Sequence, residues 1–352
     1  MSRIPRSRLR GPALLAAVAL GLAACGGADD ATDDAADNAD NADNADDATP
    51  AAATGDPSGD PVAFPLDVTD CDDVVVLDEQ PESVLTIGQA ALWLIDAAGA
   101  GDRVAARTGE FGAEVPEALS DAAASAPIAD PADPSLENIV GAEVDAVVGY
   151  GLFATTREDV ESSGAAVLTV SGECGHDEGE IPEPVTFDTV IGDVERFGEV
   201  FGTADVASDV ADTLRAEVAE LTEAAEAAGS AGTAANVYYF SSAGALSANG
   251  ATGIANAQLA AAGLDNVFGD QQTTYLDINI EALLDADPDV IVLTYGLYGE
   301  SAEEAEQKLL AEPGVADLTA VQEDRVVLMP AWQVLPAPGA VDGLRTLVES
   351  VS

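Results

Sequence analysis

Few side chains in this 352-residue chain suit redox, metal or nucleophilic chemistry, because it holds only three cysteines and one histidine. Cys25 ends an apolar segment, and His176 follows Cys174 by two residues in an acidic stretch. Zinc and manganese sites usually take more than one imidazole, and a thiol nucleophile needs a base beside it. The sequence therefore predicts no resident metal site and no cysteine catalysis, and we interpret His176 as a solvated loop residue.

Cys25 marks a segment typical of an exported lipoprotein. Four arginines within the first ten residues precede an apolar run, 12–22, which is too short to cross a bilayer comfortably. Small residues directly before a cysteine are what a lipoprotein signal peptidase requires. We expect residues 1–24 to be the signal peptide, and a palmitate-bearing lipid on Cys25 to anchor the exported protein to the outer face of the cell membrane. The alternative is an ordinary signal peptide with a chance cysteine.

Acidic residues dominate the composition: 65 Asp and Glu against 12 Lys and Arg give a formal net charge of −53. A nucleic-acid binder needs a cationic face to neutralise phosphates, so that class is excluded. Residues 25–60 are rich in Asp, Ala, Asn, Gly and Pro, and they contain an Asp-Asn-Ala repeat. We interpret this segment as a disordered acidic tether. A calcium-binding tract is the alternative, although the Asp spacing matches no EF-hand loop.

Cys71 and Cys174 are the two cysteines that remain after Cys25. An even count in an exported chain favours a disulfide. It would close a loop of roughly a hundred residues, which chain-entropy models value at about 4 kcal/mol. We therefore expect Cys71 and Cys174 to form a structural disulfide.

Short β-rich runs alternate with helical stretches from about residue 71 onward, which is typical of parallel sheets covered by helices. The predicted strands are 84–87, 104–105, 126–128, 146–148, 167–170, 236–240, 290–293 and 326–328. Segment 137–148 aligns without a gap on segment 281–292: each opens with Glu, and an Asp leads into a buried strand. This repeat indicates two similar lobes.

A helix of some 25 residues is expected from about Ala204, because Leu214, Val218 and Leu221 recur at helical spacing. The predicted fold is α/β, with two Rossmann-like lobes, each with a central parallel sheet, joined by this one long α-helix. The predicted parts are an N-terminal lobe, 61–185, connecting helices, 186–230, and a C-terminal lobe, 231–352. A stiff connection predicts only a few degrees of closure when a ligand binds.

The ligand of an α/β lobe lies beyond the carboxyl ends of its strands. Aromatic residues, scarce in this chain at 5%, gather at the predicted strand exits together with a few polar side chains. Such rings suit a large flat or greasy ligand, and arginines suit an anionic one. The candidate ligand-binding residues are Gln89, Arg107, Phe111, Tyr150, Phe153, Arg157, Tyr239, Tyr295, Tyr298 and Trp332. The alternative for each of these residues is that its side chain packs under a loop and does not contact the ligand.

The order and spacing of several segments resemble the iron-siderophore and cobalamin class of ABC-transporter substrate-binding proteins, which have the Fe/B12 periplasmic-binding (class III) fold. The similar segments are the lipoprotein signal and tether, strand 84–87, residues 134–137, the long helix, residues 253–264, residues 287–292 and Trp332. The resemblance covers about residues 70–350. The pair Cys71 and Cys174 is similar to an extra disulfide of the Gram-positive, actinobacterial-type branch.

The resemblance implies capture of a bulky iron chelate between two lobes and its delivery to a dimeric ABC permease of the iron-siderophore and cobalamin type. In that family each lobe presents a glutamate to arginines of the permease, and Glu137 and Glu281 match these positions. Two equivalent carboxylates suit a partner with two equivalent cationic pockets. The alternative is that both are ordinary glutamates at helix starts.

The resemblance implies a ferric siderophore as the transported ligand, no covalently bound cofactor and a monomeric protein. Only eight basic residues follow residue 10, which favours a ferric hydroxamate or another neutral or mildly charged chelate over a highly anionic one. Haem and cobalamin stay open, and His176 could ligate either only if its loop reached the cleft.

Two other classes compete with a binding protein of this kind. An envelope hydrolase is disfavoured because no Gly-x-Ser-x-Gly, His-Glu-x-x-His or phosphate-loop motif occurs, so we expect no enzyme activity. A zinc- or manganese-binding lipoprotein is disfavoured by the single histidine. A purely structural envelope protein would leave the internal repeat unexplained.

Overall fold

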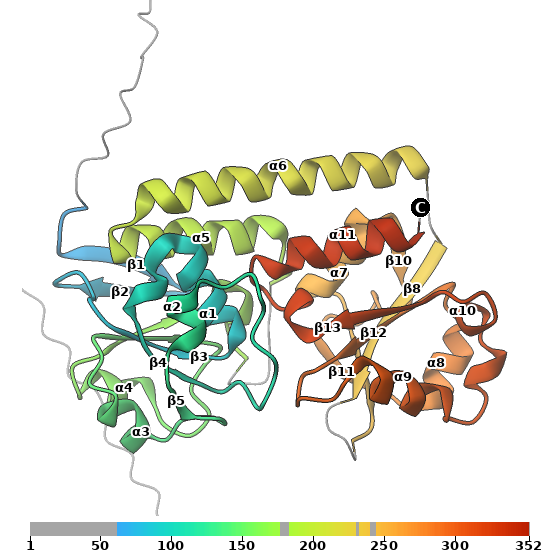
Figure 1. Ribbon diagram of the computed structural model, residues 1–352, viewed down its shortest axis with the longest axis horizontal. Helices are drawn as coiled ribbons and strands as arrows, with labels where there is room; N and C mark the ends of the chain where they lie inside the picture. The colour runs from blue at the N-terminus through green and yellow to red at the C-terminus, as the bar shows by residue number, and fades with distance from the viewer. Residues whose placement is uncertain (1–61, 177–182, 230–231, 240–243, 352) are drawn as a thin grey trace, which may run out of the picture. The chain divides into compact units, whose positions relative to one another are not determined.

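In the computed structural model, five short strands of the first half of the chain form a parallel sheet (Figure 1). In the spatial order β5-β4-β3-β6-β7 they are β5 (Ile128–Asp130), β4 (Val104–Thr108), β3 (Val84–Ile87), β6 (Ala146–Gly149) and β7 (Ala166–Thr169). The central strands β3 and β6 are buried along their whole length, as expected for a sheet covered on both faces. The intervening helices are α1 (Gln89–Ile95), α2 (Asp121–Ser125), α3 (Leu136–Gly141) and α4 (Arg157–Glu161), with helical turns at Asp96–Ala100, Gly101–Arg103 and Ser171–Glu173.

The structure describes residues 62–176, 183–229, 232–239 and 244–351, all of which belong to one compact unit, 57–352. We refer to residues 62–176 as the first lobe, and to residues 232–239 and 244–351 as the second lobe. The predicted signal peptide, the lipid on Cys25 and the tether lie outside the described residues. Among the residues that are described, no helix is both long and apolar enough to cross a membrane.

The second lobe has a mixed sheet in the order β11-β9-β8-β12-β13, and β10 pairs with the first residues of β8. The strands are β8 (Gly232–Tyr239), β9 (Leu246–Asn249), β10 (Leu264–Asn266), β11 (Tyr275–Asp277), β12 (Val290–Tyr295) and β13 (Val326–Pro330). Strands β8, β12 and β13 are parallel, whereas β9 runs antiparallel to β8 and β11 antiparallel to β9. The helices are α7 (Ile254–Ala261), α8 (Ile280–Ala286), α9 (Ala302–Leu310), α10 (Thr319–Gln322) and α11 (Gly339–Val351), with turns at Val315–Asp317 and Ala331–Gln333.

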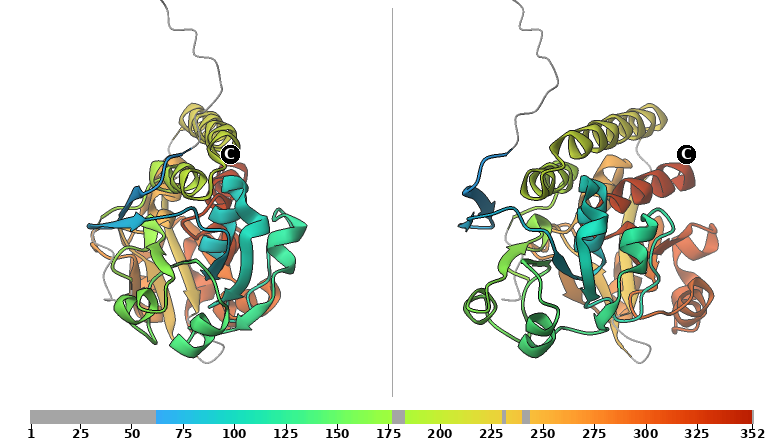
Figure 2. Two further views of the ribbon diagram at one scale, coloured as in Figure 1. Left: turned by 90° about the vertical axis from the view of Figure 1, so that its left-hand side faces the viewer. Right: turned by 60° about the vertical axis from the view of Figure 1, so that its left-hand side comes forward.

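Two helices connect the lobes. In α5 (Phe187–Phe201), Thr186 and Thr189 form a capping box at the start, and Gly202 ends the helix at φ 69°. The 25-residue α6 (Ala204–Ala228) follows and is roughly 37 Å long at 1.5 Å per residue. It lies along α5 and α11, above both lobes (Figures 1 and 2). The predicted α/β fold with one long connecting helix is confirmed.

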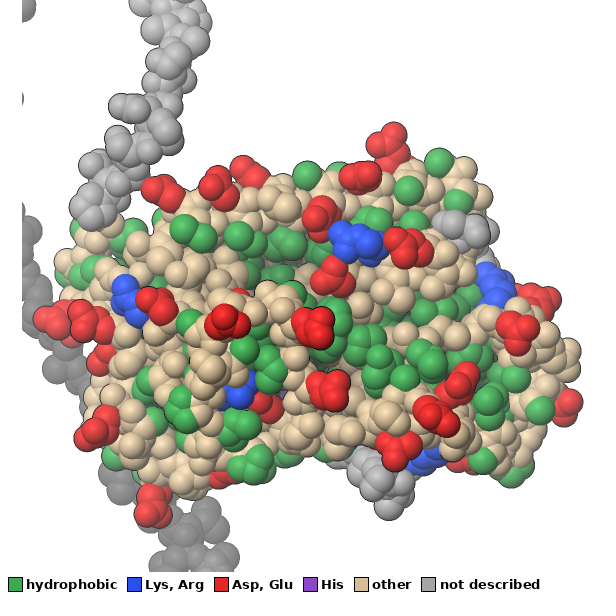
Figure 3. All heavy atoms as spheres, in the orientation of Figure 1, with side chains coloured by type: hydrophobic (Ala, Val, Ile, Leu, Met, Phe, Trp, Pro, Cys, Tyr) green, Lys and Arg blue, Asp and Glu red, His purple; other side chains and the backbone are tan. Residues whose placement is uncertain are grey.

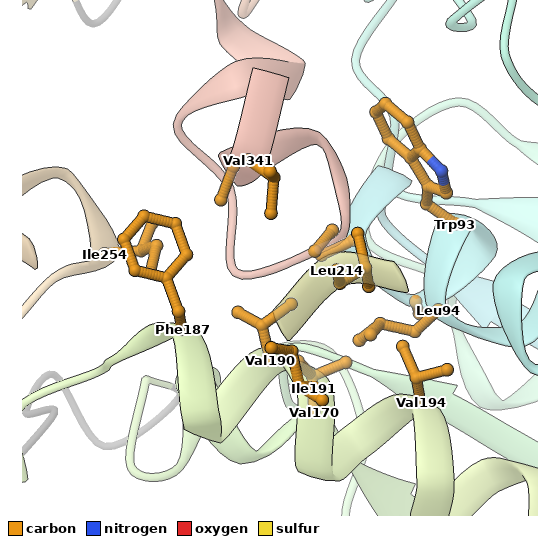
Figure 4. Packing of buried hydrophobic residues seen from close by; sticks show 14 of the residues in the cluster. Trp93, Leu94, Val170, Phe187, Val190, Ile191, Val194, Leu214, Ile254 and Val341 are labelled. Carbon is orange, nitrogen blue, oxygen red and sulfur yellow. The ribbon is translucent and has the colours of Figure 1, made fainter. Parts of the chain in front are cut away.

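One hydrophobic core extends through both lobes. Its buried members come from α1, α5 and α6 and also from α7 and α11 of the second lobe. Figure 4 shows Trp93 and Leu94 of α1, four residues of α5, and Ile254 and Val341 from the other lobe. Closure about a hinge would have to break this shared packing. The shared core therefore supports the prediction that the lobes close by only a few degrees, which stays a prediction.

A two-stranded hairpin, β1 (Leu66–Asp70) and β2 (Asp73–Leu77), precedes the first sheet. The predicted disulfide is formed: Cys71 in the hairpin turn is bonded to Cys174, which follows β7. Beside it the buried carboxylate of Asp70 is 2.5 Å from Nη2 of Arg157 and 3.5 Å from Nη1 of Arg196. The hairpin is therefore fixed to the lobe by one covalent bond and two ion pairs.

The sequence repeat is also a structural repeat. Oδ2 of Asp145 accepts hydrogen bonds from the backbone NH (3.0 Å) and the hydroxyl (2.9 Å) of Ser83. Oδ2 of Asp289 accepts the same two bonds from Thr233, at 2.7 and 2.9 Å. Each aspartate precedes a buried strand, β6 or β12, and ties it to the start of the neighbouring strand, β3 or β8. The two lobes therefore use the same local device to set the register of their central strands.

Candidate functional site

A cavity of about 620 Å³ lies between the two lobes. Its lining residues come from nearly every loop at the carboxyl edge of the first sheet and from four strands of the second. They are Gly88, Gln89, Ala90, Gly109, Glu110, Phe111, Ala113, Asp133, Tyr150, Phe153, Glu173, His176, Tyr238, Ser247, Asn249, Tyr275, Asp277, Thr294, Leu297, Tyr298, Ala331, Val334 and Leu335. A volume of this size suits a single small-molecule ligand.

The first wall is built from strand exits, as expected for a parallel sheet. Gln89 follows β3, Phe111 follows β4, Tyr150 and Phe153 follow β6, and His176 follows β7. Because each of these strands runs in the same direction, residues far apart in the chain meet at one edge.

A glycine allows the closest approach in this wall. Gly88 has φ 86°, and a Cβ on it would lie 2.6 Å from Cδ1 of Tyr150. Only glycine lets the Tyr150 ring lie against the backbone at the end of β3. The neighbouring Gln89 is buried and donates from Nε2 to the carbonyl oxygen of Glu114 at 2.6 Å.

The second wall combines alternate residues of a sheet face with loop residues that follow β12 and β13, among them Leu297, Tyr298 and Ala331. Tyr238 of β8 is opposite Ser247 of β9 in the register, and it is also opposite Thr294 of β12. Tyr275 and Asp277, two residues apart on β11, continue the same face. Since successive side chains of a strand point to opposite faces, the residues between these belong to the packed side of the sheet.

Aromatic rings from the two lobes touch across the cavity. The centroids of Phe111 and Tyr298 are 5.9 Å apart, and those of His176 and Tyr275 are 5.3 Å apart. His176 also contacts Tyr150 at 5.7 Å and Phe153 at 5.4 Å. The lobes therefore meet through ring contacts, which suit a flat or apolar ligand surface.

Among the described residues, no Lys or Arg lines the cavity, and the carboxylates that line it are Glu110, Asp133, Glu173 and Asp277. Tyr150 donates its hydroxyl to Asp133 at 2.6 Å, and burial together with this bond raises the pKa of Tyr150, so the phenol stays protonated. Burial also raises the pKa of Glu110, against the opposing charge of Arg107, whose Nη1 is 3.4 Å from Glu110 Oε1. Within the described part of the chain, no group of three or more His, Cys, Asp or Glu could hold a metal ion.

Five of the ten predicted ligand-binding residues line the cavity, namely Gln89, Phe111, Tyr150, Phe153 and Tyr298. The two predicted arginines do not. Arg107 is buried behind Glu110 and donates Nε to the carbonyl oxygen of Ala126 at 2.9 Å. Arg157 donates to Asp70 under the hairpin. In both cases a nearby carboxylate fixes the guanidinium away from the cavity.

The other three predicted residues belong to packed regions. Tyr239 and Tyr295 are each one position beyond a cavity residue on their strand, so they face the core on the opposite side of the sheet. Burial raises the pKa of Tyr239 to about 12. Trp332 packs against Trp93 with the two rings tilted and their centroids 5.3 Å apart, while Ala331 and Val334 beside it line the cavity.

His176 corrects the sequence interpretation in part. It lies in a turn with its side chain 30% exposed, but it lines the cavity, and its Nδ1 is 2.8 Å from Oε2 of Glu173. Spacing in the sequence could not reveal that this turn reaches the cavity. Sequence reasoning also missed Tyr238, Tyr275 and the cavity carboxylates. Because β8 is buried on both faces, the sequence does not indicate which of Tyr238 and Tyr239 faces the cavity, and nothing in it indicates that β11 reaches the cavity.

Glu137 and Glu281 occupy equivalent places. Each is the second residue of a short helix, α3 or α8, and each is exposed. Ser135 caps the first helix by accepting from the NH of Asn138 at 3.3 Å, and Asn279 caps the second by accepting from Ala282 at 2.9 Å. Both helices lie on the side of the unit away from α6 (Figure 1).

Comparison with known proteins agrees with this architecture. A crystal structure of an ABC-type Fe3+-hydroxamate transport system from Saccharomonospora viridis has a TM-score of 0.72 and 29% identity, covering 82% of this chain and 99% of that one. A haem-binding protein from Roseiflexus has a TM-score of 0.60 at 18% identity, covering 77% and 99%. A vitamin B12 binding protein from Vibrio cholerae has a TM-score of 0.59 at 18% identity, covering 77% and 97%.

The search of curated proteins found no match. A family model described as periplasmic binding protein matches residues 89–332, a span that begins at the first cavity loop and ends beside the last one. The chain belongs to the periplasmic binding protein family.

Proposed function

We propose that this protein is the extracytoplasmic solute-binding lipoprotein of an ABC importer, and that it captures a ferric siderophore between its lobes and delivers it to the permease. The observation that carries the proposal is the cavity of about 620 Å³, whose aromatic residues come from both lobes. The similarity to an Fe3+-hydroxamate transport protein at 29% identity supports an iron chelate as the ligand.

The proposed ligand contacts are the predicted residues that line the cavity, together with Tyr238, His176 and Tyr275. The chelate would displace little protein, because the lobes share one core. We keep Arg107, Arg157, Tyr239, Tyr295 and Trp332 out of the proposed contact set, since each is occupied by packing or an ion pair.

Titration calorimetry with a ferric hydroxamate, a ferric catecholate, haem, cobalamin and zinc tests the ligand class. We expect one saturable iron chelate at one site per chain. Binding of zinc alone, or turnover of a substrate, would contradict the proposal. As a site control, Tyr150→Ala should weaken binding, whereas Tyr295→Ala, on the packed side of the sheet, should leave the affinity of the folded protein unchanged.

Haem is the second candidate, and one observation favours it. An imidazole, that of His176, lines the cavity between two tyrosines, and imidazole is a common axial ligand of haem iron. The absorption spectrum of a haem complex would change in His176→Ala if this candidate were right. An unchanged spectrum would remove it.

Docking to the permease is proposed for Glu137 and Glu281, because two equivalent exposed carboxylates suit a two-fold partner. Glu137→Ala combined with Glu281→Ala should abolish uptake of the chelate by cells while the affinity of the purified protein stays the same. Loss of affinity in this double variant would contradict the assignment. Glu220→Gln, an exposed substitution on α6, is the matched control.

Membrane attachment through Cys25 is the remaining part of the proposal. A Cys25→Ala variant should leave the membrane fraction while its ligand affinity is preserved. Retention of this variant on the membrane would contradict lipid anchoring.

A further inference from the structure

The basic residues that the structure describes are all engaged outside the cavity. Eight Lys and Arg follow residue 10, all of them lie within the described ranges, and none lines the cavity. Arg103 donates to a carbonyl, Lys308 lies over the Tyr239 ring, and Arg325 is near Asp289. The remaining five form ion pairs with carboxylates. On the face shown in Figure 3, basic side chains are likewise few and acidic ones are spread over both lobes.

Four carboxylates line the same cavity: Glu110 and Glu173 in the first wall, Asp133 beside them, and Asp277 in the second wall. Glu110 is 6% exposed and Glu173 is 4% exposed. Oε1 of Glu110 accepts no hydrogen bond from a described residue, and the Arg107 guanidinium behind it is 3.4 Å away. Burial of an incompletely solvated carboxylate is unfavourable, and a cationic ligand group would relieve that cost.

Asp277 differs from the other three because it has no compensating group. It is exposed on β11 and forms no ion pair within the described chain, whereas Asp133 accepts from Tyr150 and Glu173 lies 2.8 Å from the His176 ring. Tyr275, two residues before Asp277, presents its ring to the same space. Carboxylates beside aromatic faces form a favourable environment for an ammonium group.

Resting on the proposed function, we propose that the cavity selects its ferric chelate by charge and favours one with a net positive charge, with Asp277 and Glu173 as the specificity-determining residues of the two walls. A ferric trihydroxamate core is neutral, since three hydroxamate anions balance Fe3+, so a pendant ammonium makes the complex cationic. A ferric tris-catecholate and the propionates of haem are anionic, and they would meet four carboxylates and no Lys or Arg.

A charge series built on one chelate tests this selection. The probes are a linear ferric trihydroxamate with a terminal primary ammonium, its N-acetyl derivative and its N-succinyl derivative, with net charges of +1, 0 and −1. We expect affinity to fall roughly tenfold with each step toward negative charge. The differences should shrink when salt rises from 0.1 to 1 M, because the screening length falls from roughly 10 to 3 Å.

Three variants test which residues cause the preference for the positively charged chelate. Asp277→Asn, an isosteric change at an exposed edge-strand position, should reduce the preference for the ammonium form over the acetyl form to a few-fold. Glu220→Gln on the outer face of α6 removes the same charge away from the cavity and should leave the preference intact. Because Glu173 is buried, Glu173→Gln is read as the ratio of the affinities for the ammonium and acetyl forms of the folded variant, and this ratio should fall toward one.

The outcomes separate this proposal from the proposed function. Equal affinity for the three chelates, or tighter binding of the succinyl form, overturns charge selection and leaves siderophore binding in place. A preference that Asp277→Asn and Glu220→Gln reduce equally overturns the assignment to the cavity. If the folded protein binds none of the three, both the charge selection and the siderophore function are overturned.

Discussion

The two walls of the cavity are built in different ways. The first consists of loops at the carboxyl edge of a parallel sheet, so its side chains come from residues directly after β3, β4, β6 and β7. The second combines loops that follow β12 and β13 with the face of a mixed sheet, in which β9 and β11 add antiparallel strands beside β8. At the strand exits the position in the chain determines which residue faces the ligand, whereas on the sheet face of the second wall the parity along the strand determines it.

This difference explains why some of the predicted ligand-binding residues line the cavity and others do not. At a strand exit several consecutive residues can turn toward the edge, so a prediction that is wrong by one position still names a residue near the cavity. Along a strand, a prediction that is wrong by one position names a side chain that points to the opposite face of the sheet. The repeat of Asp145 and Asp289 shows that the lobes share a common plan, and the walls diverge only where antiparallel strands were added to the second lobe.

The largest expected effect concerns the covalent support of the first wall. The disulfide joins Cys71 to Cys174 across 103 residues, and Cys174 lies between Glu173 and His176 of the cavity. Replacing both cysteines with serine should lower the free energy of unfolding by about 4 to 5 kcal/mol, the loop-closure value for this length. Urea unfolding of the oxidised protein and of the double variant measures the difference. Equal unfolding free energies would show that the ion pairs of Asp70 suffice to hold the hairpin.

The second prediction tests strand parity with two adjacent tyrosines. Tyr239 is 5% exposed in the packed side of the second sheet, so Tyr239→Ala should lower the free energy of unfolding by about 3 kcal/mol while the ligand affinity of the folded protein is unchanged. Tyr238 lines the cavity, so Tyr238→Ala should weaken ligand binding by roughly tenfold, about 1.4 kcal/mol. Calorimetric binding and chemical unfolding on both variants give the result, and an affinity loss confined to Tyr239→Ala would reverse the assignment of faces.

Tyr238 and Tyr239 also show which parts of the site can be predicted from the sequence. Four of the predicted cavity residues, Gln89, Phe111, Tyr150 and Phe153, follow strands of the parallel sheet, where the rule of carboxyl ends applies. The segment around Tyr239 is apolar on both sides because its strand is buried on both faces, so alternation gives no signal there.

Competing partners explain why other predicted residues lie outside the cavity. Arg107 and Arg157 were expected at the ligand as the cations available for an anionic one, yet the nearby Glu110 binds the first and the distant Asp70 binds the second. The sequence holds 65 acidic residues, and which of them meets a given arginine depends on the folded arrangement. His176 was misjudged for the same reason, since Tyr275, its ring partner in the other lobe, is 99 positions away in the chain.

A third, smaller effect tests the close packing of the first wall through two glycines with a similar positive φ. Gly88 and Gly112 have φ of 86° and 84°, so alanine should cost at least about 1 kcal/mol of stability at either position. An added Cβ at Gly88 would lie 2.6 Å from Tyr150, whereas at Gly112 nothing lies within 4 Å. Only Gly88→Ala should therefore displace the Tyr150 ring and weaken ligand binding several-fold. Equal losses of affinity in the two variants would mean that loop strain, and not the ring position, controls the site.

The smallest effect concerns the shared device that ties the central strands together. Hydrogen bonds from the backbone NH and hydroxyl of Thr233 lower the pKa of Asp289. A carboxyl with a lowered pKa in the folded state contributes stability above its unfolded-state pKa, about 3.9 for Asp, and this contribution is lost as pH falls through the folded-state value. Thr233→Val removes the bond from the hydroxyl to the carboxylate and also the bond that the hydroxyl accepts from the backbone NH of Asp289 at 3.1 Å. At this partly exposed site it should reduce stability near neutral pH by less than about 1 kcal/mol and lessen the loss of stability below pH ~4. Unfolding of both proteins between neutral and acidic pH measures the difference.

Ser83→Ala removes the equivalent hydroxyl in the first lobe. It should lower stability at neutral pH to a similar extent if these hydrogen bonds contribute equally in the two lobes. A loss of stability in one lobe alone would show that the two lobes share the geometry of these hydrogen bonds but not their contribution to stability.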